Sequence, residues 1–432
     1  MAAADPSRPP TSARAPGRHQ MITTTPSAVT PLWDSVAAAP HSPSRARAAE
    51  ALFRRAASRL PVRVVFADGT RLGAGDSGSP LMRVLDARSF FHRLGAHANV
   101  GFGESYMAGE WSSSEPADLL TPFAQRLPAL VPRPLQALRR WVQARRPELE
   151  RNTRAGARRN IRQHYDLSND FFALFLDETM TYSSALFRPD TTDLADAQRH
   201  KIDRALDVAG VHAGTRLLEI GTGWGSLALR AAERGARVTS LTLSAEQRKL
   251  ARQRIAAAGL ADRVEVHLRD YREEDGRYDA VVSVEMVEAV GSEYWPRYFR
   301  AIDELLVPGG RASLQAITMP HDRMLATRRS HNWIHKYIFP GGELLSVPAI
   351  EDGVRRHTSM QIVQRHSFGP SYAETLRRWR TGFLERWPEA AALGFNDNFR
   401  RMWEFYLAYS EAGFRSGYLD VWQFGFRKPH ER

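Results

Sequence analysis

The residues best suited to chemistry lie in two short segments, 217–225 and 241–247. The first reads Leu-Leu-Glu-Ile-Gly-Thr-Gly-Trp-Gly. An apolar run that feeds glycines and then a helical pattern is typical of an open α/β sheet where a ligand meets the C-termini of the strands. Glycines let the backbone approach such a ligand closely. The second segment, Leu-Thr-Leu-Ser-Ala-Glu-Gln, follows as the end of the next strand. Together the two segments predict a nucleotide-type cofactor site.

The glycine spacing indicates which cofactor to expect. Reading from Gly221 gives Gly-x-Gly-x-Gly, and Leu227 stands where the dinucleotide fingerprint would have its third glycine. The segment shows no motif for binding a pyrophosphate, so we expect S-adenosylmethionine (SAM) rather than NAD. A tight strand-to-helix turn without a ligand is the alternative. Ser244 and Gln247 also have the spacing of a capping box, whose simple role is to start a helix. Both interpretations can hold, because a capped helix start can form the wall of a cleft.

Composition narrows the class of protein. A chain of 432 residues with 43% hydrophobic residues suits two domains plus tails. No apolar run of about 18 residues occurs, so we expect no transmembrane helix. The first 20 residues lack the apolar core of a secretion signal. The absence of cysteine excludes disulfides, zinc-thiolate sites and a thiol nucleophile.

The charge is strongly positive, with 60 basic and 48 acidic residues and a net charge of +12. Such an excess favours an anionic partner, either nucleic acid or an anionic membrane face. Ten arginines and only two glutamates fall within residues 133–163. This stretch has few aromatics of the kind that single-strand binders interleave with basic residues. The two main interpretations of this Arg-rich stretch are therefore a solvated linker and a segment that contacts lipid headgroups. We expect no nucleic-acid partner.

Four regions are expected along the chain. We predict a disordered tail at 1–45, a small α+β domain at 46–132, an Arg-rich linker at 133–163 and a catalytic domain at 164–432. In the small domain we expect helices over 48–58, 89–94, 103–108 and 116–127, and a strand over 62–66 that turns at Asp68-Gly69. In the last region strands alternate with helices, which predicts a mostly parallel sheet covered by helices on both faces. The predicted strands span residues 216–220, 237–243, 264–268, 278–284 and 311–317.

A later segment, 372–387, has the pattern of an amphipathic helix. Its large apolar side chains share one stripe, opposite four arginines (Arg377, Arg378, Arg380 and Arg386). A core-facing helix is the main interpretation, and a helix that lies on a membrane is the alternative.

A family resemblance is carried by four further segments: 164–172, 180–185, 283–291 and 336–342. They read His-Tyr-Asp-Leu-Ser-Asn-Asp-Phe-Phe, Met-Thr-Tyr-Ser-Ser-Ala, Ser-Val-Glu-Met-Val-Glu-Ala-Val-Gly and Lys-Tyr-Ile-Phe-Pro-Gly-Gly. In order and spacing, the region from His164 to Lys428 resembles the cyclopropane-fatty-acyl-phospholipid synthases and the related mycolic-acid and branched-chain fatty-acid methyltransferases. The preceding small domain is similar to the lipid-engaging N-terminal domain of the larger bacterial members. His164 and Asp166 either open a helix or touch ligand.

The resemblance implies a class I SAM-dependent methyltransferase fold and a set of site residues. Residues implied to line SAM are Tyr182, Ser183, Glu219, Gly221, Gly223, Trp224, Gly225, Thr242, Leu243, Ser244, Gln247, Asp270 and Tyr271. A carboxylate and a tyrosine, here Glu288 and Tyr372, would help to hold a bicarbonate ion near the transferring methyl.

The implied reaction explains the need for such groups. A cis double bond is a weak nucleophile, and methylation by cationic SAM leaves a carbocation that must then lose a proton. Aromatic faces can stabilise cations without reacting, so the rings of 171, 172, 182, 333, 337 and 339 are interpretable either as cavity walls or as plain core. A base must reach the departing proton. Loss of a proton from the new methyl closes a cyclopropane, whereas loss from a neighbouring carbon leaves a branched chain.

This chain departs from the family pattern where the base is held. The family commonly has Glu-His-Val-Gly where this chain has Glu-Ala-Val-Gly at 288–291. Gln315 replaces a histidine that helps to bind bicarbonate, and Ser184 and Ser410 stand where cysteines are expected. Gln315 can still donate a hydrogen bond to an oxyanion. Glu288 has a plainer alternative as the cap of a helix at 292–299, and Glu285 competes for its role.

We therefore expect a SAM-dependent enzyme that acts on the unsaturated acyl chain of a membrane phospholipid. A cyclopropane is the leading product, and a methyl- or methylene-branched chain is the alternative. A small-molecule methyltransferase would leave the basic linker and the small domain unexplained. A cytosine-C5 methyltransferase would need the missing cysteine. His321, His331 and His335 lack metal-ligand spacing, so no metal is expected. The enzyme is expected in the cytoplasm, attached peripherally to the anionic inner face of the membrane, and a homodimer is possible.

Overall fold

The computed structural model describes residues 36–130 and 152–430, apart from residues 155, 158, 161–166 and 329 and the side chains of 127–130. Most of the predicted tail and of the Arg-rich stretch lies outside the described residues, as do His164 and Asp166. Predictions about these segments therefore stay predictions.

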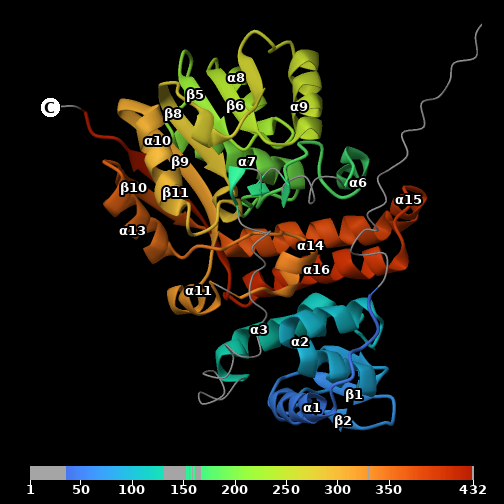
Figure 1. Ribbon diagram of the computed structural model, residues 1–432. Coiled ribbons are helices and arrows are strands. Elements are labelled where there is room, and N and C mark those ends of the chain that lie inside the picture. The colour runs from blue at the N-terminus through green and yellow to red at the C-terminus, as the bar shows by residue number, and fades with distance from the viewer. Residues whose placement is uncertain are drawn as a thin grey trace, which may run out of the picture. The chain divides into compact units, whose positions relative to one another are not determined.

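A seven-stranded sheet supports the region predicted to be catalytic (Figure 1). Its strand order is β10-β11-β9-β8-β5-β6-β7. The five strands from β9 to β7 are parallel, and β11 and β10 extend the sheet antiparallel to their neighbours. The strands span β5 (Arg216–Ile220), β6 (Arg237–Thr242), β7 (Val264–Leu268), β8 (Tyr278–Val284), β9 (Leu306–Thr318), β10 (Gln361–Ser367) and β11 (Asp420–Arg427).

Helices cover both faces of this sheet, because successive strand residues point to opposite sides. Leu217 packs with α7, α8 and α9, whereas Leu218 packs with α10 and α13. The predicted architecture, a mostly parallel sheet with helices on both faces, is confirmed. The helices of this region are α6 (Asn169–Ala173), α7 (Leu194–Val208), α8 (Ser226–Glu233), α9 (Ala245–Ala257), η2 (Tyr271–Glu273), η3 (Val287–Ala289), α10 (Trp295–Leu305), α11 (His321–Thr327), α12 (Trp333–Tyr337) and α13 (Val347–His357).

The N-terminal elements form a separate four-stranded sheet with order β2-β1-β3-β4. The helices predicted at 89–94 and 103–108 are parts of one element, α2, which is interrupted at Ala98 by a left-handed backbone (φ 48°). Helix α1 begins at Pro43, five residues before the predicted start. The bounds are α1 (Pro43–Ala57), β1 (Arg63–Phe66), β2 (Arg71–Leu72), β3 (Leu81–Val84), α2 (Ala87–Met107), β4 (Trp111–Ser112) and α3 (Pro116–Leu130).

Two long helices, α14 (Gly369–Glu385) and α16 (Asp397–Arg415), pack against each other, with the short α15 (Trp387–Ala392) between them in sequence. Helix α16 also contacts α2 and α3 of the N-terminal part. The core-facing interpretation of the amphipathic helix is confirmed, because Leu376, Trp379 and Phe383 are buried. Its arginines form ion pairs, including Arg380 with Glu411. Within the described residues, no helix is long and apolar enough to cross a membrane.

Candidate active site

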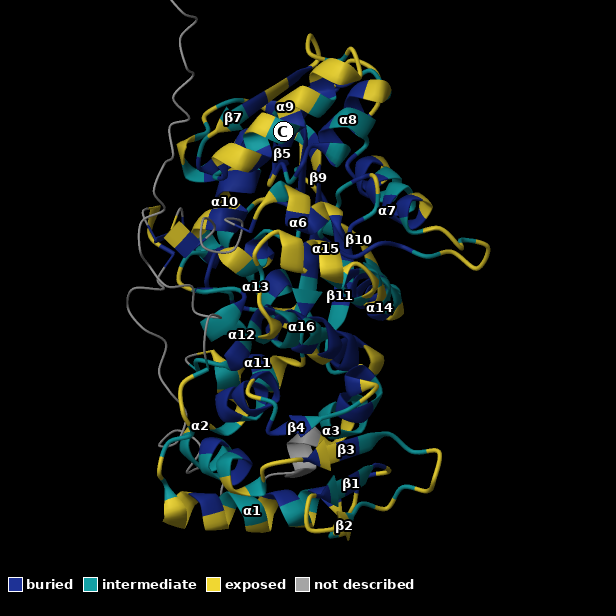
Figure 2. Ribbon diagram, turned by 90° about the vertical axis from the view of Figure 1, so that its right-hand side faces the viewer, coloured by how far each residue is buried: buried dark blue, intermediate teal, exposed yellow. Residues whose placement is uncertain are grey.

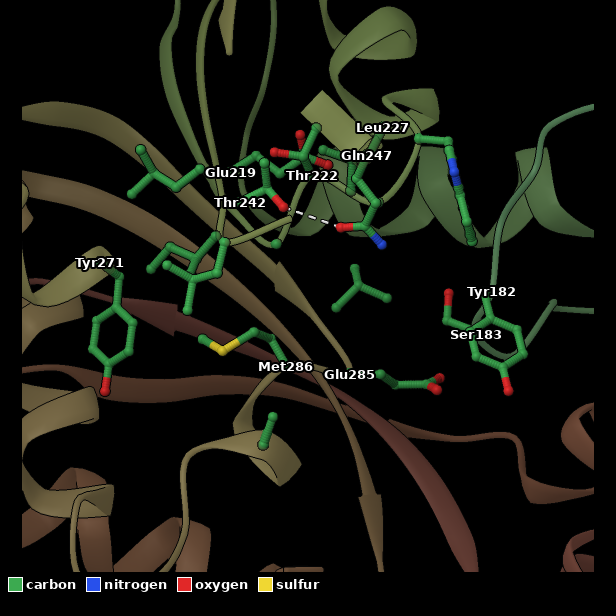
Figure 3. A pocket seen from close by; sticks show the side chains of 18 of the residues that line it. Tyr182, Ser183, Glu219, Thr222, Leu227, Thr242, Gln247, Tyr271, Glu285 and Met286 are labelled. Carbon is green, nitrogen blue, oxygen red and sulfur yellow. Dashed lines mark hydrogen bonds between the residues drawn. The ribbon is translucent and has the colours of Figure 1, made fainter. Parts of the chain in front are cut away.

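A cavity opens at the C-terminal ends of β5, β6 and β8, where the strand order reverses (Figure 3). Parallel sheets bind ligands at this point because the connections leave the central strands in opposite directions. Residues at or just beyond the ends of these strands line the cavity, among them Gly221, Thr242 and Glu285. The glycine-bearing segment 217–225 and the polar segment 241–247 are therefore brought together as predicted.

The glycine turn after β5 leaves room for a ligand. Gly221 and Gly223 have left-handed φ angles of 103° and 52° and line the cavity. A Cβ atom at Gly223 would meet no atom within 4 Å, so the turn faces open space. Gly225 differs, since it starts α8 and its hypothetical Cβ would lie 3.1 Å from the Cβ of Ala251. Gly225 therefore serves helix packing here and is not among the cavity-lining residues.

The strand end after β6 holds Gln247 in one orientation. The Thr242 hydroxyl donates to Oε1 of Gln247 at 3.0 Å. The amide nitrogen of Gln247 then lies on the cavity side (Figure 3). The side chain of Ser244 accepts from the backbone N–H of Gln247 at 3.2 Å and caps α9. Ser244 thus performs the capping role and does not itself line the cavity, while Gln247 is placed to donate to a ligand.

Replacement of Thr242 by valine should therefore weaken the binding of S-adenosylhomocysteine about 2- to 10-fold, the usual cost of one hydrogen bond. Isothermal titration calorimetry provides the measurement. The control is a double-mutant cycle with Gln247→Leu, in which the double variant should bind no worse than Gln247→Leu alone. Additive losses would show that Thr242 does not act through Gln247.

Asp270 and Tyr271 form another wall of the cavity. Burial by itself raises the pKa of Asp270, but hydrogen bonds from Arg272 outweigh it and hold that pKa below its usual range. Arg272 donates from Nε at 2.8 Å and from Nη2 at 2.6 Å, and its guanidinium lies over the ring of Tyr271. It also donates to the backbone oxygen of Asn152. Asn152 and Arg272 line the cavity too, and sequence reasoning did not identify either.

The segment that carries Tyr182 and Ser183 is anchored from two sides. The hydroxyls of Tyr182 and Tyr406 are 2.9 Å apart. From α7, Gln198 donates to the backbone oxygen of Ser183, and Lys201 Nζ donates to its hydroxyl at 2.6 Å. Trp224 donates from its indole to Asn169 at 2.7 Å. Of the six aromatic residues considered as cavity walls, Tyr182 lines this cavity, and the others pack in the neighbouring core cluster.

Three of the predicted catalytic residues, Ser184, Gln315 and Tyr372, converge on the carboxylate of Glu285. Its Oε1 accepts from the backbone N–H of Ser184 at 2.9 Å and from Nε2 of Gln315 at 2.7 Å. Its Oε2 accepts from the hydroxyl of Tyr372 at 2.7 Å. Glu285 has a left-handed backbone (φ 48°), a conformation that is strained for residues other than glycine. In Figure 3 its carboxylate extends toward Tyr182 and Ser183.

Glu288, predicted to hold bicarbonate, lies one short turn later. Its Oε1 accepts from the backbone N–H of Ile317 at 2.6 Å. Its Oε2 is buried and has no hydrogen-bond partner among the described residues. Burial and the nearby Glu285 raise the pKa of Glu288 to about 8. The alternative helix-capping role is not seen, because the N–H of Ser292 donates to Glu343 instead.

The structure thus places the predicted residues in three groups. Eleven of the predicted SAM residues line the cavity, whereas Gly225 and Ser244 do not. Ser184, Gln315 and Tyr372 surround Glu285, next to Glu288. Ser410 lies half-buried on α16, outside the cavity-lining set. Among the described residues, no group of three or more His, Asp or Glu side chains could hold a metal ion.

The two expected small molecules differ in how well they fit these residues. The open glycine turn, the oriented Gln247 and the Tyr271 wall suit SAM. Bicarbonate does not fit, because the donors expected to hold it are engaged by the Glu285 carboxylate. A second anion against that carboxylate would be repelled.

Comparisons with known proteins show which proteins this chain is similar to. The family model described as mycolic acid cyclopropane synthetase matches residues 152–424. The chain is 56% identical over 401 residues to the tuberculostearic acid methyltransferase UfaA1 of Mycobacterium tuberculosis, covering 90% of this chain and 94% of that protein. It is 35% identical over 348 residues to the cyclopropane-fatty-acyl-phospholipid synthase of Escherichia coli, covering 79% and 86%.

Solved structures show the same similarity. The cyclopropane synthase MmaA2 of Mycobacterium tuberculosis aligns with a TM-score of 0.59 and 32% identity, covering 63% of this chain and 98% of that chain. The mycolic acid cyclopropane synthase CmaA1, in complex with SAH and CTAB, aligns with a TM-score of 0.58 and 32% identity, covering 66% and 99%.

Proposed function

Since the chain belongs to the mycolic acid cyclopropane synthetase family of SAM-dependent methyltransferases, we propose that it methylates the double bond of an unsaturated phospholipid acyl chain and gives a methylene-branched product. SAM, when bound, supplies an electrophilic methyl group. The lipid substrate, the membrane surface and the product belong to the proposal. The observation that carries it is the carboxylate of Glu285 on the donors Ser184, Gln315 and Tyr372.

Glu285 is suited to take the proton that the alkylated chain must lose. Methyl transfer forms one carbon–carbon bond from the π electrons of the alkene and leaves a carbocation. A 1,2-hydride shift from the methylated carbon to its cationic neighbour places the positive charge on the methylated carbon. The new methyl group then loses a proton to Oε1 or Oε2 of Glu285, and the electrons of that C–H bond form the C=CH2 double bond of a methylene branch. The hydride shift that precedes proton loss is what separates this outcome from ring closure. No reductant is required. A saturated methyl branch would need a separate hydride donor and is not proposed.

Two observations support the branched product over the ring. The donors expected to hold a bicarbonate ion hold a carboxylate side chain instead, so the base is part of the protein. The relative with 56% identity is named a tuberculostearic acid methyltransferase, not a cyclopropane synthase. The alternative product of the sequence analysis is thus better supported than its leading one.

The product decides between the two readings. The purified protein is incubated with SAM and vesicles of a monounsaturated phospholipid, and the acyl chains are analysed by mass spectrometry after ozonolysis. The methylene and cyclopropane products are isomers of equal mass, but ozone cleaves the methylene to a ketone and leaves the ring intact. A ketone at the former double bond supports the proposal. A resistant ring would restore cyclopropane synthesis, and no added carbon on any lipid would reject the phospholipid substrate.

Binding to anionic vesicles is expected through α1. Its outward side is exposed (Figure 2) and carries Arg45, Arg47 and Arg55. Basic residues near an anionic membrane contribute about 1 kcal/mol each, and salt screens the attraction. The variant Arg47→Gln/Arg55→Gln should therefore bind anionic vesicles roughly 30-fold more weakly at low salt, as measured by sedimentation.

The matched control removes two exposed charges from α9, in Lys249→Gln/Arg252→Gln. This variant has the same net charge as the α1 variant and should bind as the unmodified protein does. Equal losses for both variants would mean that net charge, and not the α1 surface, drives binding. Binding that does not change with salt would contradict an electrostatic contact altogether.

A further inference from the structure

Helix α7 carries a lysine that is buried at the cavity. The side chain of Lys201 lines the cavity, and the residue is 1% exposed. Its Nζ donates to the hydroxyl of Ser183 at 2.6 Å. Burial of an ammonium group is costly unless opposite charge compensates it. The cavity must also admit a cationic cofactor, which a second positive charge would repel. The proposed methyl transfer does not by itself use this lysine.

One chain of contacts joins Lys201 to Glu285 through the backbone. Ser183 accepts from the ammonium, and the N–H of the next residue, Ser184, donates to Oε1 of Glu285. The ammonium and the carboxylate are thus held by consecutive residues of one loop.

A second chain of contacts joins the same two residues through the sheet. Gln423 of β11 donates from Nε2 to the backbone oxygen of Lys201 at 3.2 Å and to Oε1 of Gln315 at 2.9 Å. Because Oε1 of Gln315 is the acceptor, its Nε2 faces Glu285, to which it donates at 2.7 Å. Gln423 is 1% exposed, so water does not compete for these bonds. The two routes enclose Lys201 and Glu285 in one network.

The charges around this network favour a positive Lys201 and a negative Glu285, which are joined through intervening groups and not by direct contact. Burial lowers the pKa of Lys201 to about 8, and the carboxylates of Glu285, Asp177 and Glu219 oppose that effect. Burial raises the pKa of Glu285 above its usual range, and Tyr372 and Lys201 offset part of that rise. Glu288 of η3 lies near Glu285, and burial together with Glu285 raises the pKa of Glu288 to about 8, so Glu288 adds no negative charge at neutral pH. Lys201 is the positive group among these neighbours.

We propose that Lys201 is the buried counter-charge of Glu285: its ammonium, held by Ser183, keeps the Glu285 carboxylate ionised and able to accept the proton of the substrate. This inference rests on the proposed function, in which Glu285 is the base. Lys201 is a positioning residue, since it acts through Glu285. The pairing also cancels its positive charge, which would otherwise repel a sulfonium cofactor and a carbocation.

The variant Lys201→Met tests the proposal through the pH dependence of kcat/KM. A general base works when deprotonated, so activity rises with pH through the pKa of Glu285. Removal of the ammonium removes an influence that lowers this pKa. The acidic limb should therefore move to higher pH by about 1 to 3 units, the usual effect of one nearby opposite charge. Lys201→Arg retains the charge and should keep the limb near that of the unmodified enzyme.

The matched control is Gln198→Met, on the same face of α7. Gln198 is 0% exposed and donates to the backbone oxygens of Thr181 and Ser183, so it holds the same loop without a charge. This variant should weaken S-adenosylhomocysteine binding and leave the acidic limb in place. An equal shift of the limb in Gln198→Met, or no shift in Lys201→Met, would overturn the proposal.

A direct readout separates this inference from the proposed function. The carboxyl infrared band of Glu285, assigned by its loss in Glu285→Gln, should titrate at higher pH in Lys201→Met than in the unmodified protein. This measurement needs no turnover. An unshifted band would overturn the counter-charge role, whereas absence of methyl transfer to any lipid would overturn the proposed function alone. If Lys201→Met does not fold, Lys201→Gln provides the neutral variant.

Discussion

Glu285→Gln is expected to lower turnover by about 100- to 10,000-fold, the range of a lost general base. An amide has nearly the shape of the carboxylate but cannot take up the proton. One of the three donors around the carboxylate, which come from Ser184, Gln315 and Tyr372, would also lose its acceptor. Binding of S-adenosylhomocysteine should change much less, because the cofactor wall built by Thr242 and Gln247 is untouched. Turnover is measured with radiolabelled SAM and phospholipid vesicles.

Glu288→Gln is the matched control, three residues away on the same turn. The pKa of Glu288 is raised to about 8, so this carboxyl holds its proton at neutral pH and glutamine imitates that neutral form. Turnover should fall less than about 10-fold, the cost of one altered hydrogen bond. If Glu288→Gln were inactive and Glu285→Gln active, the base would be Glu288, the carboxylate that the sequence analysis expected to hold bicarbonate.

Sequence reasoning located both glutamates just beyond β8 and ranked Glu288 above Glu285, whereas of the two the structure puts Glu285 among the residues that line the cavity. Both follow β8 within four residues, and Glu285 was only a competitor there. The difference arises from the left-handed backbone at Glu285 and from Tyr372, which lies 87 residues later. The local sequence pattern around the two glutamates contains neither of these facts. The cofactor segments were easier, because glycines at a strand end constrain the chain locally.

Lys201 shows a signal that sequence reasoning could have used. In α7 it stands on the stripe of Leu194, Ala205 and Val208, at spacings of seven, four and three residues. A charged residue on the buried face of an amphipathic helix is costly and is often functional. Its partner cannot be found this way, because Glu285 comes from a different element.

The fold was predictable where strands are apolar. The strands predicted at 216–220, 264–268 and 278–284 agree with β5, β7 and β8. Strands β5 and β8 are central in the sheet and largely buried on both faces, which gives nearly continuous apolar runs. The edge strand β7 was recognisable instead from its alternation of apolar and polar residues. Strands β10 and β11 were missed. The edge strand β10 is largely exposed and polar, so it lacks the apolar run, and Gly425 interrupts β11. Their pairing is fixed by contact with β9, which only the tertiary fold provides.

Glu285→Gly is expected to be inactive alone and to regain activity, by about tenfold or more, when formate or bicarbonate is added. Glycine accepts the left-handed backbone that a glutamate adopts there at a cost, so the local fold should persist. The N–H of Ser184, the amide of Gln315 and the hydroxyl of Tyr372 would then surround a space of carboxylate size. Buried donors without an acceptor are unfavourable, and a small anion satisfies them. Turnover is measured against anion concentration.

The pattern of rescue distinguishes a built anion site from a general salt effect. A branched anion such as pivalate is too large for the space and should not rescue. Tyr372→Phe in the Glu285→Gly background removes one donor and should weaken rescue, and Glu288→Gly should show no response to formate. The unmodified enzyme should not respond to bicarbonate, since its donors already hold a carboxylate. If bicarbonate instead proved necessary for the unmodified enzyme, Glu285 would not be the base, because the proton acceptor would have to come from solution.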